Sequence, residues 1–177
     1  MHIKTRNFEK GVVLVQLFEK NFKKSDTIII EEGKIVICFC AAIVYFGCGK
    51  HKEALRWLNR IIHHTDSKIR PDYQSLARIL NIIIQYESGN MELIESAISS
   101  AERFLKTRKT FYKIEEAFMR FSKTIITSIS AKKKKELFAA FGKQLTAISK
   151  NPYEKQSLNY FDFIAWVENK IEGKSFA

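Results

Sequence analysis

Residues 45–55 read Tyr45-Phe46-Gly47-Cys48-Gly49-Lys50-His51-Lys52-Glu53-Ala54-Leu55, and this stretch decides the fold. It ends an apolar run that begins at Ile35, and Gly49 is the residue type that most often ends a helix. A second helical pattern starts at once, with Ala54, Leu58 and Ile61 on one face. The stretch therefore predicts a helix over about 31–46, a tight turn, and a helix over 51–64.

A second joint of the same type lies downstream. Residues 85–95 read Gln85-Tyr86-Glu87-Ser88-Gly89-Asn90-Met91-Glu92-Leu93-Ile94-Glu95. In both joints a glycine ends the first helix, and a small or apolar residue follows five positions later, where it faces the partner helix. That residue is Ala54 in the first joint and Ile94 in the second. The chain is therefore expected to contain two helical hairpins.

Helical periodicity continues through most of the chain and predicts further helices over 7–22, 71–87, 91–106, 110–128, 131–149 and 153–172. Pro71 fits the first turn of its helix, where a missing N–H costs nothing. Only 7 Gly and 2 Pro occur in 177 residues. This scarcity disfavours β-sandwiches and barrels, which need a turn signal every ~8–12 residues. We expect an all-α fold of about eight helices, with antiparallel neighbours because the connections are short.

The first hairpin resembles the tetratricopeptide repeat, a helix–turn–helix unit of ~34 residues. The resemblance is carried by Ala41-Ala42, Tyr45, Gly49, Ala54, Leu58 and Asp66. Small side chains at Ala42 and Ala54 allow the two helix backbones to approach closely. The second hairpin departs from the repeat, because Ile82 and Ile94 stand where small residues are usual. Gly49 and Gly89 also lie 40 positions apart, and the extra residues fall in the loop before Pro71.

The resemblance implies antiparallel hairpins stacked as a right-handed superhelix. The repeat-like pairs would be 31–66 and 70–107, followed by C-terminal helices over 110–173 that fit no repeat template. Nothing in the chain marks a second domain, so residues 1–177 are expected to form one tetratricopeptide-like helical domain.

A longer stretch, from about Glu32 onward, is similar to the C-terminal part of bacterial tetratricopeptide-like proteins. The similar segments are Lys68-Ile69-Arg70-Pro71-Asp72, Ala77-Arg78-Ile79-Leu80-Asn81, Arg103-Phe104-Leu105-Lys106 and Tyr160-Phe161-Asp162-Phe163-Ile164-Ala165-Trp166-Val167-Glu168. Proteins of this kind usually carry further helix pairs upstream, which would make this chain a fragment of a longer array. The family has no assigned activity, so no catalytic residue is carried over.

In tetratricopeptide repeats the first helix of each pair lines a concave groove that selects the ligand. By resemblance, the groove positions here are Val36, Phe39, Ile43 and Phe46, then Leu76, Ile79, Ile83 and Tyr86. Nearly all are apolar. Either the groove takes an apolar helix or peptide, or neighbouring helices of the same chain cover these positions. We favour self-burial, because an uncovered apolar strip of this size promotes aggregation.

The segment predicted as the last helix has an unusually wide apolar face. Its central stripe contains Tyr160, Phe163, Ile164, Val167 and Ile171, with Phe161 and Trp166 on either side. A wide face suits a helix packed against two neighbours. The alternative is a homodimer or partner contact centred on Trp166, because tryptophan is enriched among interface anchors.

The chain is strongly basic, with 30 Lys+Arg against 19 Asp+Glu and a net charge of +11. The run Lys132-Lys133-Lys134-Lys135 falls in the first turn of its predicted helix, where cations oppose the macrodipole. A second basic region contains Arg103, Lys106, Arg108, Lys109 and Lys113. These groups are either solvated helix ends or a surface for an acidic protein, a phosphate or nucleic acid.

Cysteine and hydropathy patterns bound the remaining chemistry. Cys38, Cys40 and Cys48 contain no C-x-x-C pair and fit small buried side chains in a reducing compartment, so we expect no metal site. The apolar run over 35–49 is shorter than the ~20 residues that cross a bilayer. No signal peptide is apparent at the start of the chain. We therefore expect a cytoplasmic protein without membrane insertion.

No catalytic motif was found among the nucleophile-elbow, P-loop, dinucleotide-binding and H-E-x-x-H patterns. The adjacent pairs Glu31-Glu32, Glu115-Glu116 and His63-His64 point in different directions on a helix, so we interpret them as surface residues. The sequence therefore predicts a non-enzymatic protein–protein interaction module without a cofactor, with homo-oligomerisation as one option. The alternative is a basic helical repeat that binds nucleic acid, and a third hypothesis is an enzyme whose site matches none of these motifs.

Overall fold

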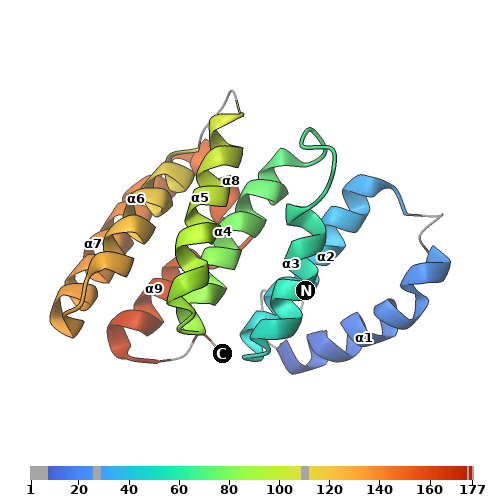
Figure 1. Ribbon diagram of the computed structural model, residues 1–177, viewed down its shortest axis with the longest axis horizontal. Helices are drawn as coiled ribbons and strands as arrows, with labels where there is room; N and C mark the ends of the chain where they lie inside the picture. Colours follow the sequence, from blue (N-terminus) through green and yellow to red (C-terminus); the bar gives the residue numbers. More distant parts are fainter. Residues whose placement is uncertain (1–7, 26–28, 109–111, 175, 177) are drawn as a thin grey trace. The chain divides into compact units, whose positions relative to one another are not determined.

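The computed structural model describes residues 8–25, 29–108, 112–174 and 176, and their side chains except those of 21–25 and 156–157. Within this part of the chain there are nine helices and no strand, so the predicted all-α class is confirmed (Figure 1). The helices are α1 (Phe8–Ser25), α2 (Glu31–Gly47), α3 (His51–Ile62), α4 (Pro71–Glu87), α5 (Met91–Lys106), α6 (Lys113–Thr127), α7 (Ala131–Ser149), α8 (Pro152–Leu158) and α9 (Phe163–Glu172).

The bounds of α2, α4, α5 and α7 agree with the prediction to within one residue. The single helix predicted over 153–172 is wrong, because the chain leaves the helix after Leu158 and starts another at Phe163. The physical reason is the side chain of Asp162, which accepts a hydrogen bond from the backbone N–H of Ala165 at 3.0 Å. An aspartate in this position caps a helix N-terminus. Residues 110 and 111 of the predicted sixth helix lie outside the described residues.

Contacts between residues divide the chain into two compact units. The boundary between them in the sequence falls at the second glycine joint. Unit 1 consists of the described residues up to Ser88, and unit 2 of those from Gly89 to Phe176. The boundary therefore falls between α4 and α5, inside the segment that the sequence presents as a second hairpin.

Unit 1 is built around the contacts of α2 with α3 and of both with α4. Ala42 on α2 and Ala54 on α3 are both fully buried, as close packing of these two helices requires. Trp57 and Leu58 of α3 are also fully buried, and the ring of Phe39 meets Tyr73 of α4 edge to face at 5.2 Å between centroids. These three helices thus supply side chains to the core of unit 1, as does α1 through Phe8 and Val12.

The turn between α2 and α3 satisfies the last carbonyl groups of α2. The N–H of Lys50 donates to the carbonyl of Tyr45 at 2.9 Å, and the N–H of Gly49 donates to that of Phe46 at 2.9 Å. Gly49 has φ +68°. This pair of bonds with a left-handed glycine is the Schellman motif. Gly89 has φ +69°, so both glycines adopt the backbone that the sequence predicts.

Contact between α1 and α2 depends on two positions without a side chain. A Cβ at Gly47 would fall closer than 3.0 Å to the ring of Phe8, and one at Gly11 would lie 2.9 Å from Val44. Distances of this kind are not tolerated between real atoms, so the neighbouring helix would have to move. The two glycines therefore set how closely α1 approaches α2.

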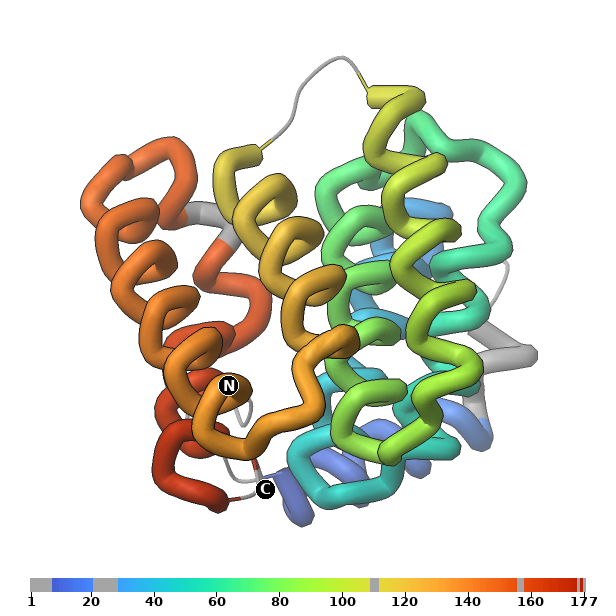
Figure 2. The backbone as a smooth tube through the Cα atoms, turned by 60° about the vertical axis from the view of Figure 1, so that its left-hand side comes forward, coloured from blue at the N-terminus to red at the C-terminus, as the bar shows by residue number. Residues whose placement is uncertain are grey.

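Unit 2 has an aromatic core contributed by α6, α7 and α9. Phe121 of α6 stacks on Phe141 of α7 with ring centroids 4.3 Å apart, and Trp166 of α9 meets Phe138 at 5.4 Å. Phe118 of α6 contacts the rings of Phe121, Phe141 and Trp166, and also that of Phe163 of α9 at 6.2 Å. Figure 2 shows α6 and α7 running side by side in opposite directions. Aromatic pairs add about 0.5–1.5 kcal/mol each beyond the apolar area they bury.

Two buried carboxylates secure the start of α6. Glu115 accepts a hydrogen bond from the N–H of Tyr112 at 3.1 Å and pairs with Arg108 at 2.5 Å. Glu154 of α8 accepts from the N–H of Lys113 with both oxygens, at 3.1 and 2.9 Å. These contacts satisfy N–H groups that a helix start leaves without a partner. Glu115 is 1% exposed, so its interpretation as a surface residue is wrong. No pattern in the sequence indicates that α8 caps α6.

Among the described helices, none is both long and apolar enough to cross a bilayer.

We predict that Gly47→Ala destabilises the protein by about 2 kcal/mol, because the added methyl group overlaps the Phe8 ring. Gly49→Ala should cost about 1 kcal/mol through backbone strain alone, since nothing lies within 4 Å of its added Cβ. The decisive measurement is urea unfolding of a double-mutant cycle with Phe8→Ala. In that background Gly47→Ala should cost little while Gly49→Ala keeps its full cost, and equal costs in both backgrounds would disprove the steric account.

Candidate functional site

The apolar positions that the sequence assigned to a groove on α2 lie mostly in the core. Phe39 is 1% exposed, and Ile43 and Phe46 are each 2% exposed, whereas Val36 is half-buried. The ring of Phe46 packs against that of His51, with centroids 5.6 Å apart. Of the two interpretations weighed from the sequence, these burials support self-burial.

The corresponding positions on α4 show the same trend. Leu76, Ile79 and Ile83 are at most 3% exposed, and Tyr86 is half-buried. Burial and the nearby carboxylate of Glu87 raise the pKa of the Tyr86 phenol. Tyr86 and Val36 are therefore the members of the predicted groove set with appreciable solvent contact.

Phe161 and Trp166, proposed from the sequence as partner contacts, are each 2% exposed. Trp166 belongs to the aromatic core of unit 2, where it contacts Phe118 and Phe138. Phe161 lies in the turn before α9 and packs edge to face on Phe163 with centroids 4.8 Å apart. Both side chains therefore belong to the packing of unit 2 instead of lying on its surface.

The structure does not gather the basic residues into one patch. Arg103 and Lys106 lie near the C-terminal end of α5, close to where α6 begins. The run Lys132, Lys133, Lys134 and Lys135 lies in the first turn of α7, at the opposite end of α6 (Figure 2). A 15-residue helix such as α6 is about 22 Å long. In salt, the interaction between exposed charges is largely screened beyond ~8–10 Å, and the length of α6 exceeds this distance. The two basic regions therefore do not form one charged surface.

One groove on unit 2 combines an apolar floor with a charged rim, and we take it as the candidate binding site. It lies between α5 and α6 and has a volume of about 210 Å³. Leu105 and Met119 form the floor and are 3% and 7% exposed. The rim is formed by Glu102, Lys106, Glu116, Arg120 and Lys123. The volume is below the ~300–1,000 Å³ of small-molecule sites, and it suits one or two side chains of a bound peptide.

The charged rim is only partly paired. The ammonium of Lys123 lies 2.5 Å from Glu102 across the groove, so this pair holds α5 and α6 together. Arg120 lies 3.8 Å from Glu116 on its own helix, with both side chains more than 60% exposed. Exposed pairs of that kind contribute little, about 0–1 kcal/mol. Lys106 and Arg120 are therefore the rim groups most able to bind a carboxylate.

A second apolar surface lies on α1, where Val13, Leu14 and Leu17 are each more than half exposed. It borders a shallow concavity that also includes Gln16, Glu19 and Lys20. Glu19 is engaged by Arg56 of α3 at 2.7 Å. This surface has a less distinctive charge pattern than the groove on unit 2.

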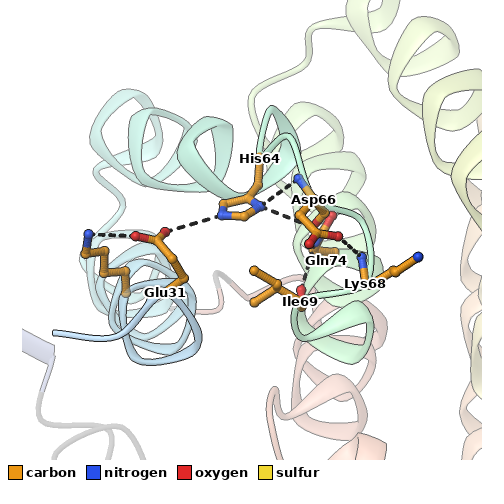
Figure 3. Close-up of polar contacts among 7 residues, drawn as sticks. Glu31, His64, Asp66, Lys68, Ile69 and Gln74 are labelled. Carbon is orange, nitrogen blue, oxygen red and sulfur yellow. Dashed lines mark hydrogen bonds and ion pairs between the residues drawn. The ribbon is translucent and has the colours of Figure 1, made fainter.

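A polar cluster in unit 1 surrounds the loop between α3 and α4 (Figure 3). The carboxylate of Glu31 on α2 lies 2.7 Å from the ammonium of Lys34 and 3.4 Å from Nε2 of His64. Nδ1 of His64 lies 3.2 Å from the backbone nitrogen and 3.1 Å from the carbonyl oxygen of Asp66. Hydrogen bonding by Lys34 and then His64 lowers the pKa of Glu31.

Gln74 of α4, which is fully buried, also holds this loop in place. Its amide donates to the carbonyls of Asp66 and Ile69, both at 2.8 Å. Two carbonyl acceptors fix which end of the amide is the nitrogen. The cluster thus consists of contacts that order a loop, and it presents no nucleophile next to His64 within the contacts that define it.

Arg78 of α4 secures the end of α3. Its guanidinium donates to the carbonyls of Ile62 and Gln74, both at 2.9 Å. Ile62 is the last residue of α3, and terminal carbonyls need partners outside their own helix. Burial lowers the pKa of Arg78 to about 10, so the group stays charged at neutral pH.

Arg70 precedes α4 with φ 46° and is the one non-glycine residue with positive φ between Phe8 and Phe176, within the described ranges. Such a backbone costs about 1–2 kcal/mol. Two hydrogen bonds to Asp72, at 3.0 and 2.7 Å, and a stacked Tyr73 ring at 4.1 Å hold the side chain in place. These contacts offset the strain at the start of α4.

Within the described ranges, no three His, Cys, Asp or Glu side chains lie close enough together to hold a metal ion. The three cysteines are free thiols. Burial raises the pKa of Cys38 to about 11, so this thiol is protonated at neutral pH.

Sequence reasoning did not identify the α5–α6 groove as a site. It named Lys106 as part of a basic region, but Leu105, Met119 and the acidic rim carried no distinguishing pattern. Their common feature is a position on facing sides of two helices. The signal that could have identified the groove is the (i, i+3) and (i, i+4) spacing of Glu116, Met119 and Arg120, in which charged residues flank an apolar one.

We predict that Arg78→Met destabilises the protein by about 2 kcal/mol, because the carbonyl of Ile62 loses a charged donor while the apolar stem is kept. Arg103→Met is the matched control, since Arg103 is exposed, and it should change stability by less than about 0.5 kcal/mol. Both values come from urea unfolding. Equal effects of the two substitutions would show that Arg78 does not secure α3.

The contact between Arg70 and Asp72 makes the stability of the protein depend on pH. Burial of Asp72 raises its pKa, but the Arg70 guanidinium outweighs this effect and brings the pKa below its ordinary value of 3.8. A carboxylate with a lowered pKa stabilises the fold above its unfolded pKa and loses this contribution as the pH falls through the folded value. Between about pH 6 and about pH 2.5, Asp72→Asn should therefore lose less stability than the wild type. Chemical denaturation at both pH values measures this. If the wild type and Asp72→Asn lose the same free energy of unfolding between them, the prediction is wrong.

Comparisons of the chain with protein-family models, with curated proteins and with solved structures found no match.

Proposed function

We propose that this chain is a non-enzymatic protein-binding module, and that the α5–α6 groove takes a short segment of a partner protein. The observation that carries the proposal is the apolar floor of Leu105 and Met119 enclosed by charged side chains from two helices. Apolar anchors bound in a pocket, with a polar rim around them, are the usual anatomy of protein interfaces.

The charges on the rim indicate the chemistry of the partner. Lys106 is exposed, and Arg120 makes a long contact to Glu116 at 3.8 Å. The net charge of the chain is +11, which attracts acidic partners over distances of several ångströms. The segment that fits is an apolar side chain, which fills the floor, flanked by aspartate or glutamate.

The finer fold assignment is part of the same proposal. We infer a tetratricopeptide-like repeat in the pair α2–α3 and a right-handed superhelix for the longer assembly. The fully buried Ala42 and Ala54 and the left-handed Gly49 support the repeat. The free thiols of Cys38, Cys40 and Cys48 support a cytoplasmic location, where cysteines stay reduced.

Nucleic-acid binding receives less support from the arrangement of the basic residues. Arg103 and Lys106 lie at one end of α6, and the lysine run 132–135 lies at the other. A phosphate backbone is bound by several cations along one continuous surface. The groove between α5 and α6 also has two carboxylates in its rim, which would repel phosphate.

The test is selection of a displayed library of random peptides on the full chain, followed by fluorescence anisotropy with a selected peptide. Selected sequences should contain an apolar residue next to aspartate or glutamate. Lys106→Glu with Arg120→Glu should weaken binding at least tenfold, because reversing two exposed charges costs more than about 1.4 kcal/mol of binding free energy.

The matched control is Lys143→Glu with Lys150→Glu, which makes the same charge change on two exposed residues, one on α7 and one directly after it. This control should bind the selected peptide with a Kd within about threefold of the wild type, because long-range charge contributes little in about 0.15 M salt. If the groove variant and the control bind the peptide equally, the groove is not the binding site.

A further inference from the structure

The connection between α6 and α7 exposes an apolar side chain almost completely. Ile129 is 98% exposed and stands between Ser128 and Ser130. Ser130 caps α7 by accepting a hydrogen bond from the N–H of Lys133 at 3.4 Å. The cap fixes the direction in which α7 leaves the turn, so Ile129 marks the tip of this end of unit 2.

Four lysines surround that tip. Lys132, Lys133 and Lys135 are exposed and Lys134 is half-buried, and all four lie within the first five residues of α7. Side chains on a helix lean toward its N-terminus, so these ammonium groups lean toward Ile129. Lys133 lies 3.6 Å from Glu136, and for the other three lysines no ion pair occurs among the described residues.

The lysines do not serve the stability of α7. Cations in the first turn of a helix oppose its macrodipole and cost about 0.3–1 kcal/mol each when exposed. The first turn of α7 contains no acidic residue that would reverse this effect. The four lysines therefore lower the stability of α7, and nearby carboxylates do not balance their charge. A polyanionic partner is the best explanation for such a cluster.

The residue types distinguish between two classes of polyanion. Residues 128–137 contain four lysines but no arginine and no aromatic residue. Nucleic-acid sites favour arginine forks on phosphate and aromatic rings that stack on bases. Anionic lipid surfaces are bound by lysine clusters beside an apolar side chain that enters the interface. The fully exposed Ile129 fits the second class.

We propose that the edge formed by Ile129 and Lys132–Lys135 docks the protein peripherally on an anionic phospholipid surface. The lysines lie over the lipid phosphates and carboxylates, and Ile129 enters the headgroup region. This edge lies at the end of α6 away from where α6 begins, so it is separate from the rim at Lys106.

The experiment is sedimentation of the full chain with vesicles in low salt. The chain should bind vesicles containing about a third phosphatidylserine and should not bind vesicles of phosphatidylcholine alone. Lys132→Gln with Lys135→Gln should weaken partitioning about 30-fold, which corresponds to about 2 kcal/mol at ~1 kcal/mol per lysine. Circular dichroism should show unchanged helix content, since both side chains are exposed.

A second arm follows the tip itself. In Ile129→Trp, the emission of the introduced indole should shift to shorter wavelength when anionic vesicles are added. The native Trp57 and Trp166 are 0% and 2% exposed, so their emission changes little. Brominated lipids should quench the shifted signal. Ile129→Ser should bind the same vesicles several-fold more weakly than the wild type.

The matched control is Lys143→Gln on α7 with Lys150→Gln just after its last residue, which removes the same charge away from the first turn and should leave most of the vesicle binding. Equal weakening by the control and by the variant of the first turn would show that total charge, and not this edge, governs binding. Retention on DNA without binding to anionic vesicles would also overturn the proposal and assign the edge to nucleic acid.

Discussion

The packing of Phe118 and Phe121 against the rings of α7 and α9 fixes α6, which forms one side of the groove and leads into the turn of the second proposed surface. The stacked pair Phe121–Phe141, 4.3 Å between centroids, sets the spacing of α6 and α7. One side of α6 then presents Met119 and Arg120 to the groove, and its C-terminal end leads into the turn that exposes Ile129. A change in this aromatic core would therefore move both surfaces together.

The positive charges of the chain have different physical roles in different parts of the structure. In the groove, Lys123 is held by Glu102 at 2.5 Å and contributes mainly to the contact between α5 and α6. In the first turn of α7, lysines stand against the helix macrodipole without enough counter-charge. The first arrangement stabilises the fold, and the second makes a surface available to a polyanion. The net charge of +11 alone does not distinguish them.

Much of the fold was predictable because helix periodicity and helix stops act locally. Gly49 and Gly89 end α2 and α4 where the sequence predicted, since a left-handed backbone costs little for glycine. The split between α8 and α9 was missed, because the apolar stripe around Phe163 concealed the capping role of Asp162. The candidate site was not predictable in the same way. Leu105 and Met119 form one floor only because two helices meet, and no local pattern records that contact.

The sequence by itself determined the helical class, most helix bounds and the excess of positive charge, because these follow from periodicity, turn residues and composition. The tertiary structure alone decided which groups meet. It brought Glu31 to His64 at 3.4 Å, although the sequence treated both as separate surface residues. It also placed Phe39 and Trp166 in the cores of their units. The physical reason is that burial and pairing depend on contacts between distant elements, whereas helix formation depends mainly on neighbours within one turn.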